Sequence, residues 1–589
     1  MGALAAVAIP GGQADERLVD RMLAAAPHRG SERKTIVVRS CALGFSERPG
    51  SKDGSIATDG GTAAVLVGRV DNLADLARRF PPTNGHDSAS EPAAILIRTF
   101  RVLGDDAPNV LRGAFSGVVT DGNRMVFFRD HTGQSNLFYR SESGRTLVST
   151  EAKQIVAGSE ITKEPDPEAM ELAFFGQGDG SKASLKGVYR APKATSLIVG
   201  EGRLRQRRYW HPENVLETAR LSADDVQDRF EYLFTQACER TFTGRDVLSL
   251  SGGIDSPTIA AYAARSHLEI TGDPLAAMSS VYPSMPAVDE TRYVRLVSEE
   301  LGLPLHTFEH GFKELDRIDE RMDLVDGVVA RLSINMVIEQ YTLTRDLGFQ
   351  TILTGRGAEE VFDARDFLIP HLVWRGRLAA LRVQMAHRRA RGWSMPAMAR
   401  ELSWAFVPGF IAAPYLRRNR DWSPEWIDTH HLPVRDEAAR PPWKRWQEEQ
   451  VSFLFEPDPE QSADEICQAF CGIEERKPWV DVDLWEFFLS LPAEIKLPHI
   501  RRKELIRKVG RGRVPDAILD RRDKTLFGQA MRAATDYGDL RRWLSLPTVR
   551  MPGVDYKALL GHIDRQDLTE AGLVWATRLA RVHAFLARW

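Results

Sequence analysis

Cysteine is scarce in this sequence, and neither sign of charge is in excess. The 589 residues include four cysteines, 78 Lys and Arg residues and 81 Asp and Glu residues, so the formal net charge is -3. So few cysteines provide no disulfide framework, which indicates a reducing compartment. The balanced charge lacks the basic footprint of nucleic-acid-binding proteins, so we expect no nucleic-acid partner.

Long apolar runs are also missing. The opening segment, MGALAAVAIPGGQ, has neither the basic start nor the apolar length of a signal peptide. The most apolar later stretch, LSWAFVPGFIAAPYL, is too short to span a membrane and contains two prolines. With 43% hydrophobic and 27% charged residues, the composition predicts a cytoplasmic globular protein of two or three domains.

The sequence pattern divides the chain into two parts. Residues 1–210 contain short β-like runs such as TAAVLVGRV and RMVFFRD between helical patterns, which predicts an α+β domain with antiparallel sheets. From about residue 220, strands alternate with longer amphipathic segments, which is typical of a parallel sheet covered by helices. Residues 366–460 form an insertion of helical stretches rich in Arg and Trp, and residues 461–589 are predicted to be mostly helical.

The stretch VLSLSGGIDSPTIAAYAARS, residues 247–266, predicts a buried strand, a tight loop and an apolar helix. Loops that follow the strands of an open α/β sheet lie where such sheets bind ligands. Glycines let the backbone approach an anion, and the first N–H groups of the helix can hold it. We expect Asp255 or Ser256 to cap the helix and Pro257 to occupy its first turn. The loop therefore predicts a phosphate site, and it is not a Walker loop because no Gly-Lys-Ser/Thr follows.

Three further segments carry a resemblance together with this loop. They are LTGRGAEEVF (353–362), GIEERKPWVDVDLWEFFLSLPAEIK (472–496) and RRKELIRKVGRGRVPDAILDRRDKTLFG (501–528). With SGGIDS (251–256) they resemble, in the same order, motifs of the asparagine-synthetase-like ligases, a branch of the N-type ATP pyrophosphatases. The resemblance implies an α/β PP-loop synthetase domain, of the adenine nucleotide alpha hydrolase-like type with helical additions, over residues 220–589.

The N-terminal half resembles the glutaminase domain of the same family, which implies an Ntn-hydrolase-like αββα domain over residues 1–210. The matching segments are HRGSE (28–32), LRGAFSGVVTD (111–121), DHTGQSNLFY (130–139) and VSTEAKQI (148–155). In such domains the nucleophile is a cysteine that becomes the first residue, with its own α-amine as base. This chain has Gly2 there, and its earliest cysteine is Cys41. We therefore expect an inactive glutaminase domain with a structural or docking role, and another source of the amine.

The resemblance also implies the roles of individual residues in an ATP- and Mg²⁺-dependent adenylation. Asp255 and Glu359 would hold Mg²⁺, although Glu359 replaces the usual Asp, and Lys524 would neutralise the transition state. Mg²⁺ takes one or two carboxylates together with substrate phosphates, which tolerates the longer side chain. The other expected ligand-binding residues are Ser251, Gly252, Gly253 and Ser256 in the loop, Thr354 and Gly355 in the adenylate pocket, and the backbone of Leu250 and Met278 near adenine.

Arg356 departs from the two best-known branches of the family. Asparagine synthetases have Glu at this position, and β-lactam synthetases have a Tyr that manages proton transfer with a Glu. Glu474 occupies the position of that Glu, but a permanently charged Arg356 cannot act as a base. We expect Arg356 to pair with Glu474 or to bind a substrate carboxylate. The catalytic candidates are therefore Lys524, Glu474 and Arg356.

A third branch of the family, the macrolactam-forming cyclases of lasso peptide biosynthesis, fits the sequence better. These ligases lack the cysteine, activate an Asp or Glu side chain of a precursor peptide and close the ring with the N-terminal amine. The insertion at 366–460 resembles their extra helical region, and a leader-binding protein and a leader peptidase are the implied partners. Two alternatives stay open. One is an asparagine synthetase or β-lactam synthetase-like ligase of a small acid, and the other is a degenerate scaffold that binds peptide or ATP.

Some polar residues have a simpler structural interpretation. Cys467 and Cys471 are four positions apart on a predicted helix without a matching second pair, so we expect core thiols rather than a metal site. Asp481 and Asp483 are predicted to be structural caps. Arg501, Arg502 and Lys503 are either surface charges or groups near phosphate, and Lys503 is the best placed of the three.

Overall fold

The protein is described from a computed structural model. The structure describes residues 2–51, 54–82, 91–142, 144–159, 161–176, 180–329, 333–359, 368–403, 406–408, 411, 423–431, 441–456, 458–498, 503–521, 525, 528–547 and 550–589. Lys524 is outside the described residues. Among the helices described, none combines the length and the apolar character needed to cross a membrane.

The N-terminal half contains two six-stranded antiparallel sheets. The first has the order β10-β8-β9-β1-β3-β2 and the second the order β12-β11-β7-β6-β5-β4. The strands of the first sheet are β1 (Ala3–Ala8), β2 (Glu32–Val38), β3 (Cys41–Glu47), β8 (Phe138–Glu142), β9 (Arg145–Ser149) and β10 (Tyr189–Arg190). Those of the second are β4 (Gly54–Asp59), β5 (Thr62–Val70), β6 (Gly113–Thr120), β7 (Met125–Arg129), β11 (Thr195–Gly200) and β12 (Arg203–Arg208).

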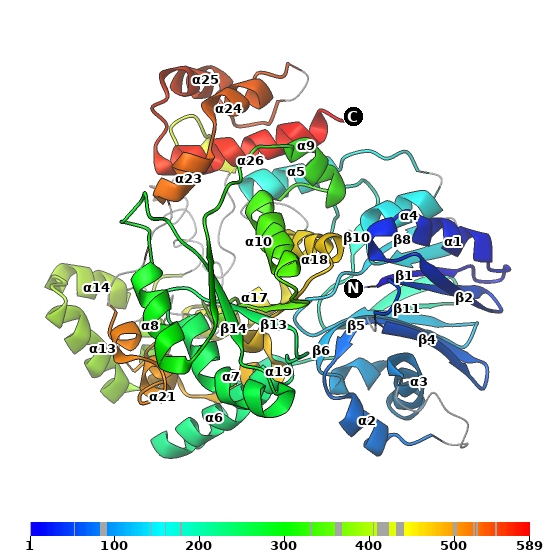
Figure 1. Ribbon diagram of the computed structural model, residues 1–589, viewed down its shortest axis with the longest axis horizontal. Helices are drawn as coiled ribbons and strands as arrows, with labels where there is room; N and C mark the ends of the chain where they lie inside the picture. Colours follow the sequence, from blue (N-terminus) through cyan, green and yellow to red (C-terminus); the bar gives the residue numbers. More distant parts are fainter. Residues whose placement is uncertain are drawn as a thin grey trace.

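Side chains that alternate along β1 and β5 pack the two sheets face to face. Leu4 and Ala6 share one core with Val65, between the sheets. Val7, which points to the other face of β1, packs with Val19 of α1. The helices that cover the outer faces are α1 (Glu16–Ala24) and α4 (Ala152–Gly158) on the first sheet, and α3 (Pro92–Leu103) on the second. The layers are therefore α, β, β and α, as expected for this half (Figure 1).

The second half is built around a five-stranded parallel sheet. Its order is β15-β14-β13-β16-β17, and every neighbouring pair is parallel. The strands are β13 (Asp246–Ser249), β14 (Ala276–Ser280), β15 (Leu305–Phe308), β16 (Thr351–Leu353) and β17 (Glu474–Arg476). The chain adds β14 and β15 on one side of β13 and then returns to add β16 on the other. The order thus reverses between β13 and β16, which is where open α/β sheets bind ligands.

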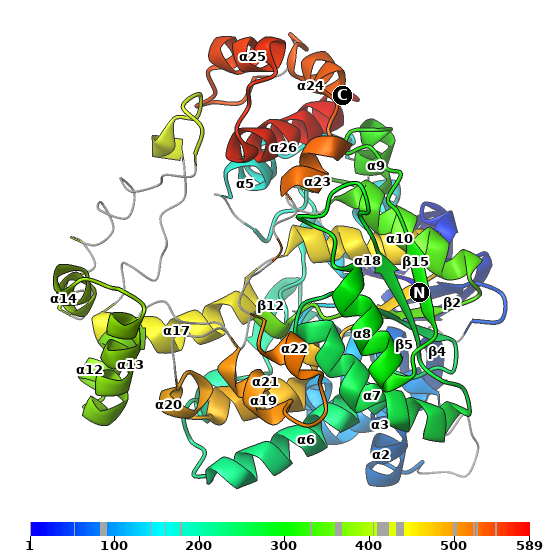
Figure 2. The same cartoon turned by 60° about the vertical axis from the view of Figure 1, so that its left-hand side comes forward.

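Helices connect and cover the parallel strands. Those before and between the strands are α6 (Ala223–Glu239), α7 (Asp255–Thr271), α8 (Thr291–Leu301), α9 (Ile318–Leu324), α10 (Ile334–Asp346) and α18 (Pro459–Cys471). Between β16 and α18 the chain forms α12 (Leu368–Trp374), α13 (Leu378–Ala390), α14 (Met395–Ser403) and α17 (Pro442–Phe455). Figure 2 shows α12, α13 and α14 at one edge of the molecule, away from the N-terminal sheets.

The C-terminal part is helical, as the sequence predicts. Its helices are α19 (Val482–Ser490), α20 (Ala493–Lys496), α21 (Glu504–Val509), α22 (Asp516–Leu519), α23 (Gly528–Ala534), α24 (Tyr537–Leu544), α25 (Tyr556–Arg565) and α26 (Glu570–Leu586). The remaining elements are α2 (Leu73–Arg79), α5 (Pro167–Phe175) and the 3₁₀ turns Pro27–Arg29, Gly104–Val110, Pro212–Val215, Thr429–His431 and Pro478–Val480.

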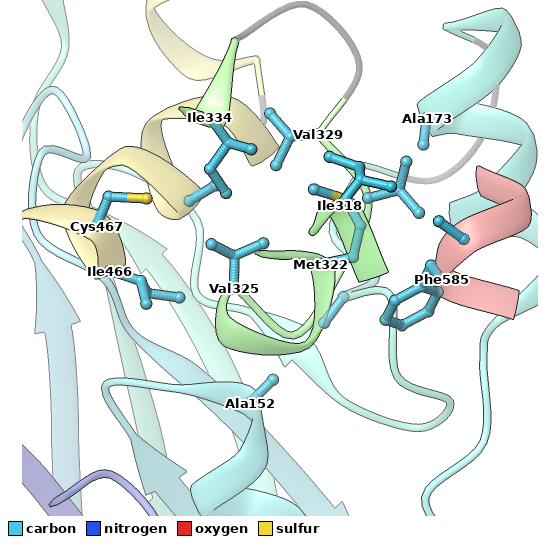
Figure 3. Packing of buried hydrophobic residues seen from close by; sticks show 14 of the residues in the cluster. Ala152, Ala173, Ile318, Met322, Val325, Val329, Ile334, Ile466, Cys467 and Phe585 are labelled. Atoms are coloured by element: carbon cyan, nitrogen blue, oxygen red, sulfur yellow. The ribbon is translucent and has the colours of Figure 1, made fainter. Parts of the chain in front are cut away.

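One apolar core joins the two halves. Ala173 of α5 and Ala152 of α4 lie in the same cluster as Met322 of α9 and Phe585 of α26, as Figure 3 shows. Cys467 belongs to this cluster too, and both it and Cys471 are buried free thiols. Burial raises the pKa of Cys467, which fits the expected core role. Among the described residues there is no cluster of three or more His, Cys, Asp or Glu side chains that could hold a metal.

Candidate active site at the carboxyl ends of the parallel strands

The loop between β13 and α7 is held by its own serines. The Ser251 N–H donates to Ser256 Oγ at 2.9 Å, and the two hydroxyls are 3.1 Å apart. The predicted cap is wrong: α7 begins at Asp255 after Ile254, without a side-chain cap, and Pro257 is its third residue. Because the hydroxyl of Ser256 fixes the loop backbone, it is not available to cap the helix.

Glycine is required where this loop meets the loop after β16. A Cβ on Gly355 would lie 3.0 Å from Asp255 Cβ and 3.1 Å from Ser256 N. A Cβ on Gly252 would lie 2.8 Å from Arg521 Nη1. The loop after β16 therefore packs closely against the start of α7 at the switch point of the sheet, where the sequence predicts the nucleotide site.

Two expected metal ligands converge on one cationic group. Lys503 Nζ lies 2.5 Å from Asp255 Oδ2 and 3.7 Å from Glu359 Oε1. Lys503 is buried, whereas the Asp255 and Glu359 side chains are 24% and 53% exposed. Carboxylate oxygens that share one cation are a donor set that fits Mg²⁺, with the remaining ligands supplied by phosphates. Asp255 and Glu359 would hold the ion, which would neutralise phosphate charge there.

A second charged cluster surrounds Gly252. The Gly252 N–H donates to Glu290 Oε2 at 2.9 Å, so this loop amide binds a carboxylate oxygen. Arg521 Nη1 donates to Glu290 Oε1 and to Gly252 O, each at 2.7 Å. Thr525 Oγ1 donates to the same Glu290 oxygen at 2.6 Å. Arg521 and Thr525, which precede and follow Lys524 in the sequence, therefore both bind Glu290, and Arg521 also binds the loop.

Sequence reasoning missed Glu290 and Arg521 as members of this site. The available signals were an acidic residue directly before a predicted helix and an arginine inside the RRDKTLFG motif. Neither signal identifies a partner, because Gly252 and Arg521 are 269 positions apart.

The expected nucleotide-pocket residues lie at the ends of three neighbouring strands. The Leu250 N–H donates to Met278 O at 2.9 Å, which extends the β13–β14 ladder by one residue. The Thr354 N–H donates to Arg476 O at 3.0 Å, and its hydroxyl donates to Glu475 Oε1 at 2.7 Å. These positions therefore surround the point at which the strand order reverses.

Arg356 pairs with carboxylates other than the expected one. Its Nη1 lies 3.1 Å from Asp464 Oδ2 and 3.3 Å from Glu475 Oε2. Lys477 Nζ lies 3.0 Å from the same Glu475 oxygen and 3.7 Å from Asp464 Oδ2. Burial opposes ionisation of Asp464, but Arg356 and Lys477 hold its pKa well below the usual range. Burial lowers the pKa of Arg356 and its two acidic partners raise it, with a net rise, so the guanidinium stays charged.

The expected Arg356–Glu474 pair is wrong. Glu474 Oε2 accepts from Arg476 at 2.8 Å, and Oε1 lies 3.2 Å from Arg69 Nε in the N-terminal domain. Burial raises the pKa of Glu474, but these two arginines lower it to a net value of about 2. The reason is strand geometry: successive side chains of β17 point to opposite faces, so Glu475 faces Arg356. Glu474 is not brought together with the other candidates.

The position of the glutaminase nucleophile has no space for a side chain. A Cβ on Gly2 would lie 2.7 Å from the carbonyl oxygen of Ser46. The Gly2 carbonyl accepts from Arg29 Nη1 at 3.3 Å. Arg29 is fully buried and bound by Glu151 and by Glu465, whose Oε2 lies 2.5 Å from Arg29 Nη2. Gly2 therefore fits the packing of this region, and a cysteine does not.

Comparisons with known proteins agree with this geometry. An α/β domain with a phosphate-type loop, joined to an αββα domain, defines a nucleotide-dependent ligase of the amidotransferase type. Residues 229–559 match the asparagine synthase family, and residues 1–210 match the glutamine amidotransferase domain. The chain belongs to the asparagine synthase family, whose members are ATP-dependent ligases that form AMP and pyrophosphate.

Three curated relatives show different parts of this similarity. Asparagine synthetase [glutamine-hydrolyzing] 3 of Bacillus subtilis is 24% identical over 78% of this chain and 74% of its own length. Carboxyethyl-arginine beta-lactam-synthase of Streptomyces clavuligerus is 28% identical, over 36% of this chain and 39% of its own. Amidase chyE of Penicillium rubens is 26% identical, over 46% of this chain and 43% of its own.

Proposed function

We propose that this ligase adenylates an Asp or Glu side chain of a precursor peptide and closes a macrolactam with the peptide's N-terminal amine. The carboxylate attacks the α-phosphorus of ATP, the bond to pyrophosphate breaks, and an acyl-adenylate results. The amine then attacks the acyl carbon, releasing AMP and a proton. A leader-binding protein and a leader peptidase would supply the leader-free peptide, and Lys524 would neutralise charge at phosphorus.

The observation that supports this proposal most is the packing around Gly2. Gly2 has no thiol to release ammonia from glutamine, and a Cβ there would meet the Ser46 carbonyl at 2.7 Å unless the backbone shifted. We infer that the amine arrives with a substrate rather than from glutamine. An amine in the same molecule as the activated acid reacts at a high effective concentration, which favours a cyclisation.

An exposed aromatic cluster in the helical insertion supports a peptide substrate. The Trp374 ring centroid lies 5.0 Å from that of Trp443 and 6.2 Å from that of Phe406, and all three residues are exposed. Arg375 follows Trp374 directly, and Arg377 is two positions further on. Aromatic and arginine side chains are enriched at protein recognition surfaces. Such a surface suits a peptide better than a single amino acid.

A second candidate is ring closure in a small molecule. It is favoured by the similarity to a beta-lactam-synthase, which covers 36% of this chain. In both candidates Asp255 and Glu359 would hold Mg²⁺ at the phosphates, with Lys503 beside them. The candidates differ in the acid that is activated.

The test is pyrophosphate release with purified protein, ATP and Mg²⁺, compared between acids. A leader-free precursor peptide is expected to stimulate release and to lose the mass of one water. Asparagine formed from aspartate and ammonia, with the peptide unaltered, would overturn the proposal. ATP binding without pyrophosphate release from any acid would instead indicate a scaffold.

A further inference from the structure

A cavity lies between the two halves of the chain, beside Arg356. Its volume is about 290 Å³. Thr132 and Lys193 border it from the N-terminal domain, and Arg356 borders it from the loop after β16. Side chains of Phe453, Val480 and Trp485 provide apolar wall. The cavity is therefore next to the candidate active site and has both charged and apolar surface.

Lys193 is the unusual group in this cavity. The residue is only 9% exposed, and among the described residues its ammonium has no ion pair or hydrogen bond. Burial lowers the pKa of Lys193 to about 8. The charged groups that act on it are, in order of influence, Asp458, Arg129, Asp130 and Glu456. Burial of the residue disfavours its charged form, and a carboxylate that entered the cavity would offset this cost.

Asp458, the acidic group with the largest influence on Lys193, already accepts other hydrogen bonds. Asp458 caps α18, and its Oδ1 accepts the N–H groups of Glu460 and Gln461 at 3.0 Å each. Asp464, on the next turn of α18, is held by Arg356 and Lys477. Neither carboxylate therefore neutralises Lys193 by contact.

Arg356 adds positive charge at the other side of the cavity. Only its Nη1 contacts Asp464 and Glu475, and 39% of the side chain is exposed. The surface of Arg356 that is not covered by these carboxylates therefore faces the cavity. Lys193, Arg356 and Lys477 thus border the cavity together with the carboxylates of Asp458, Glu460 and Asp464, and apolar residues complete its walls.

We propose that this cavity binds a second carboxylate of the substrate, carried on an apolar group, with Lys193 as its counter-ion. This carboxylate is distinct from the one that is adenylated. The inference rests on the proposed function, because it assigns another part of the same substrate. Such a carboxylate occurs at the C-terminus of a peptide and at the α-carbon of a free amino acid.

The direct test uses 3-phenylpropionate as the probe and the neutral 3-phenylpropionamide as its isostere. Calorimetry on the full chain without ATP is expected to show at least tenfold tighter binding of the acid. Lys193→Met is expected to abolish this preference, and Lys193→Arg to retain it. Lys186→Met, which removes an exposed lysine of the same domain, is the matched control and should bind as the unaltered protein does.

A measurement on the unaltered protein covers the case in which Lys193→Met does not fold. Acylation of Lys193 by acetic anhydride, followed by peptide mass spectrometry, should slow at least fivefold with saturating 3-phenylpropionate and not with the amide. Equal protection by both probes, or by neither, would overturn the proposal.

Turnover then separates the two sources of the carboxylate. A peptide with a free C-terminus should have a tenfold lower KM than its C-terminal amide if the peptide end occupies the cavity. An unchanged peptide KM, together with competition by free amino acids, would assign the cavity to an α-carboxylate. Probe binding needs no ATP, so it can be observed even if no peptide is cyclised. Failure of the proposed function can therefore be distinguished from failure of the cavity proposal.

Discussion

The two regions in which this chain places buried charge differ in how the charge is satisfied. Around Gly2, the Arg29 guanidinium is closed between Glu151 and Glu465, and no side chain fits beside it. At the ends of the parallel strands, Asp255 and Glu359 are partly exposed and meet at one ammonium. The first arrangement joins two halves of a fold, and the second is open to a ligand. From this comparison we predict that the chemistry lies in the second half.

The largest expected effect follows from Asp255→Asn. Loss of this carboxylate removes a cation-binding oxygen next to the phosphates, so pyrophosphate release should fall by at least about 10³-fold. Asp228→Asn changes an exposed acid on α6 and is the matched control, with full activity expected. A full rate for Asp255→Asn in a folded protein would remove the loop from the reaction.

Arg29→Met tests whether the first region is structural. Removal of the guanidinium leaves Glu151 and Glu465 buried without their main cation, so the free energy of unfolding should fall by about 3–5 kcal/mol. Urea unfolding at pH 7 measures the change. Arg78→Met, which removes an exposed partner of Asp75, should change stability by less than about 0.5 kcal/mol. An equal effect of both substitutions would contradict the structural role of Arg29.

Two lysines, Lys153 and Lys193, test whether a buried ammonium with ion-pair partners and one without them affect stability in opposite directions. Lys153 Nζ lies 3.3 Å from Glu151 and 3.6 Å from Asp326, and despite burial these partners raise its pKa. Lys153→Met should therefore lower stability at pH 7 by about 1–3 kcal/mol. Lys193→Met should raise it by about 1–3 kcal/mol, because the folded pKa of Lys193 is about 8, below the unfolded value. Urea unfolding of both variants at pH 7 measures the two changes, and the same sign of change for both lysines would contradict this contrast.

The stabilisation expected from Lys193→Met should decrease as the pH rises. The penalty for the buried ammonium is fully present below pH 8 and disappears as the pH rises toward the unfolded pKa, about 10.4. The increase in the free energy of unfolding caused by Lys193→Met should therefore become smaller over this pH interval, as measured by urea unfolding. A gain that is constant from pH 7 to 10 would show that titration of Lys193 is not its cause.

The smallest expected effect is that of Gly2→Cys. The new Cβ would meet the Ser46 carbonyl, so stability should fall by about 1 kcal/mol, and Gly2→Ala should behave alike. Glutamate release from glutamine measures activity, and none is expected from either variant. Glutamine hydrolysis by Gly2→Cys alone would show that the first region is a working site that lacks only its thiol.

Motifs and periodicity predicted the layers of both halves and the position of the phosphate loop, because these depend on local patterns. The buried strand and its glycine loop predicted Ser251 and Asp255, and the family resemblance of the 353–362 segment predicted Glu359. Glu474 was placed on the wrong face, since the boundaries of a three-residue strand do not fix which residue points to Arg356. The Lys193 cavity was not predictable, because elements of both halves, far apart in the chain, form its walls.

The central claim is that ATP-dependent amide formation here takes its nitrogen from the substrate. It is tested by incubating the protein with ATP, Mg²⁺, leader-free peptide and glutamine labelled with ¹⁵N in the amide, followed by mass spectrometry. The predicted product is lighter than the peptide by one water and contains no ¹⁵N. A product that carries ¹⁵N would contradict the account, because glutamine would then supply the amine.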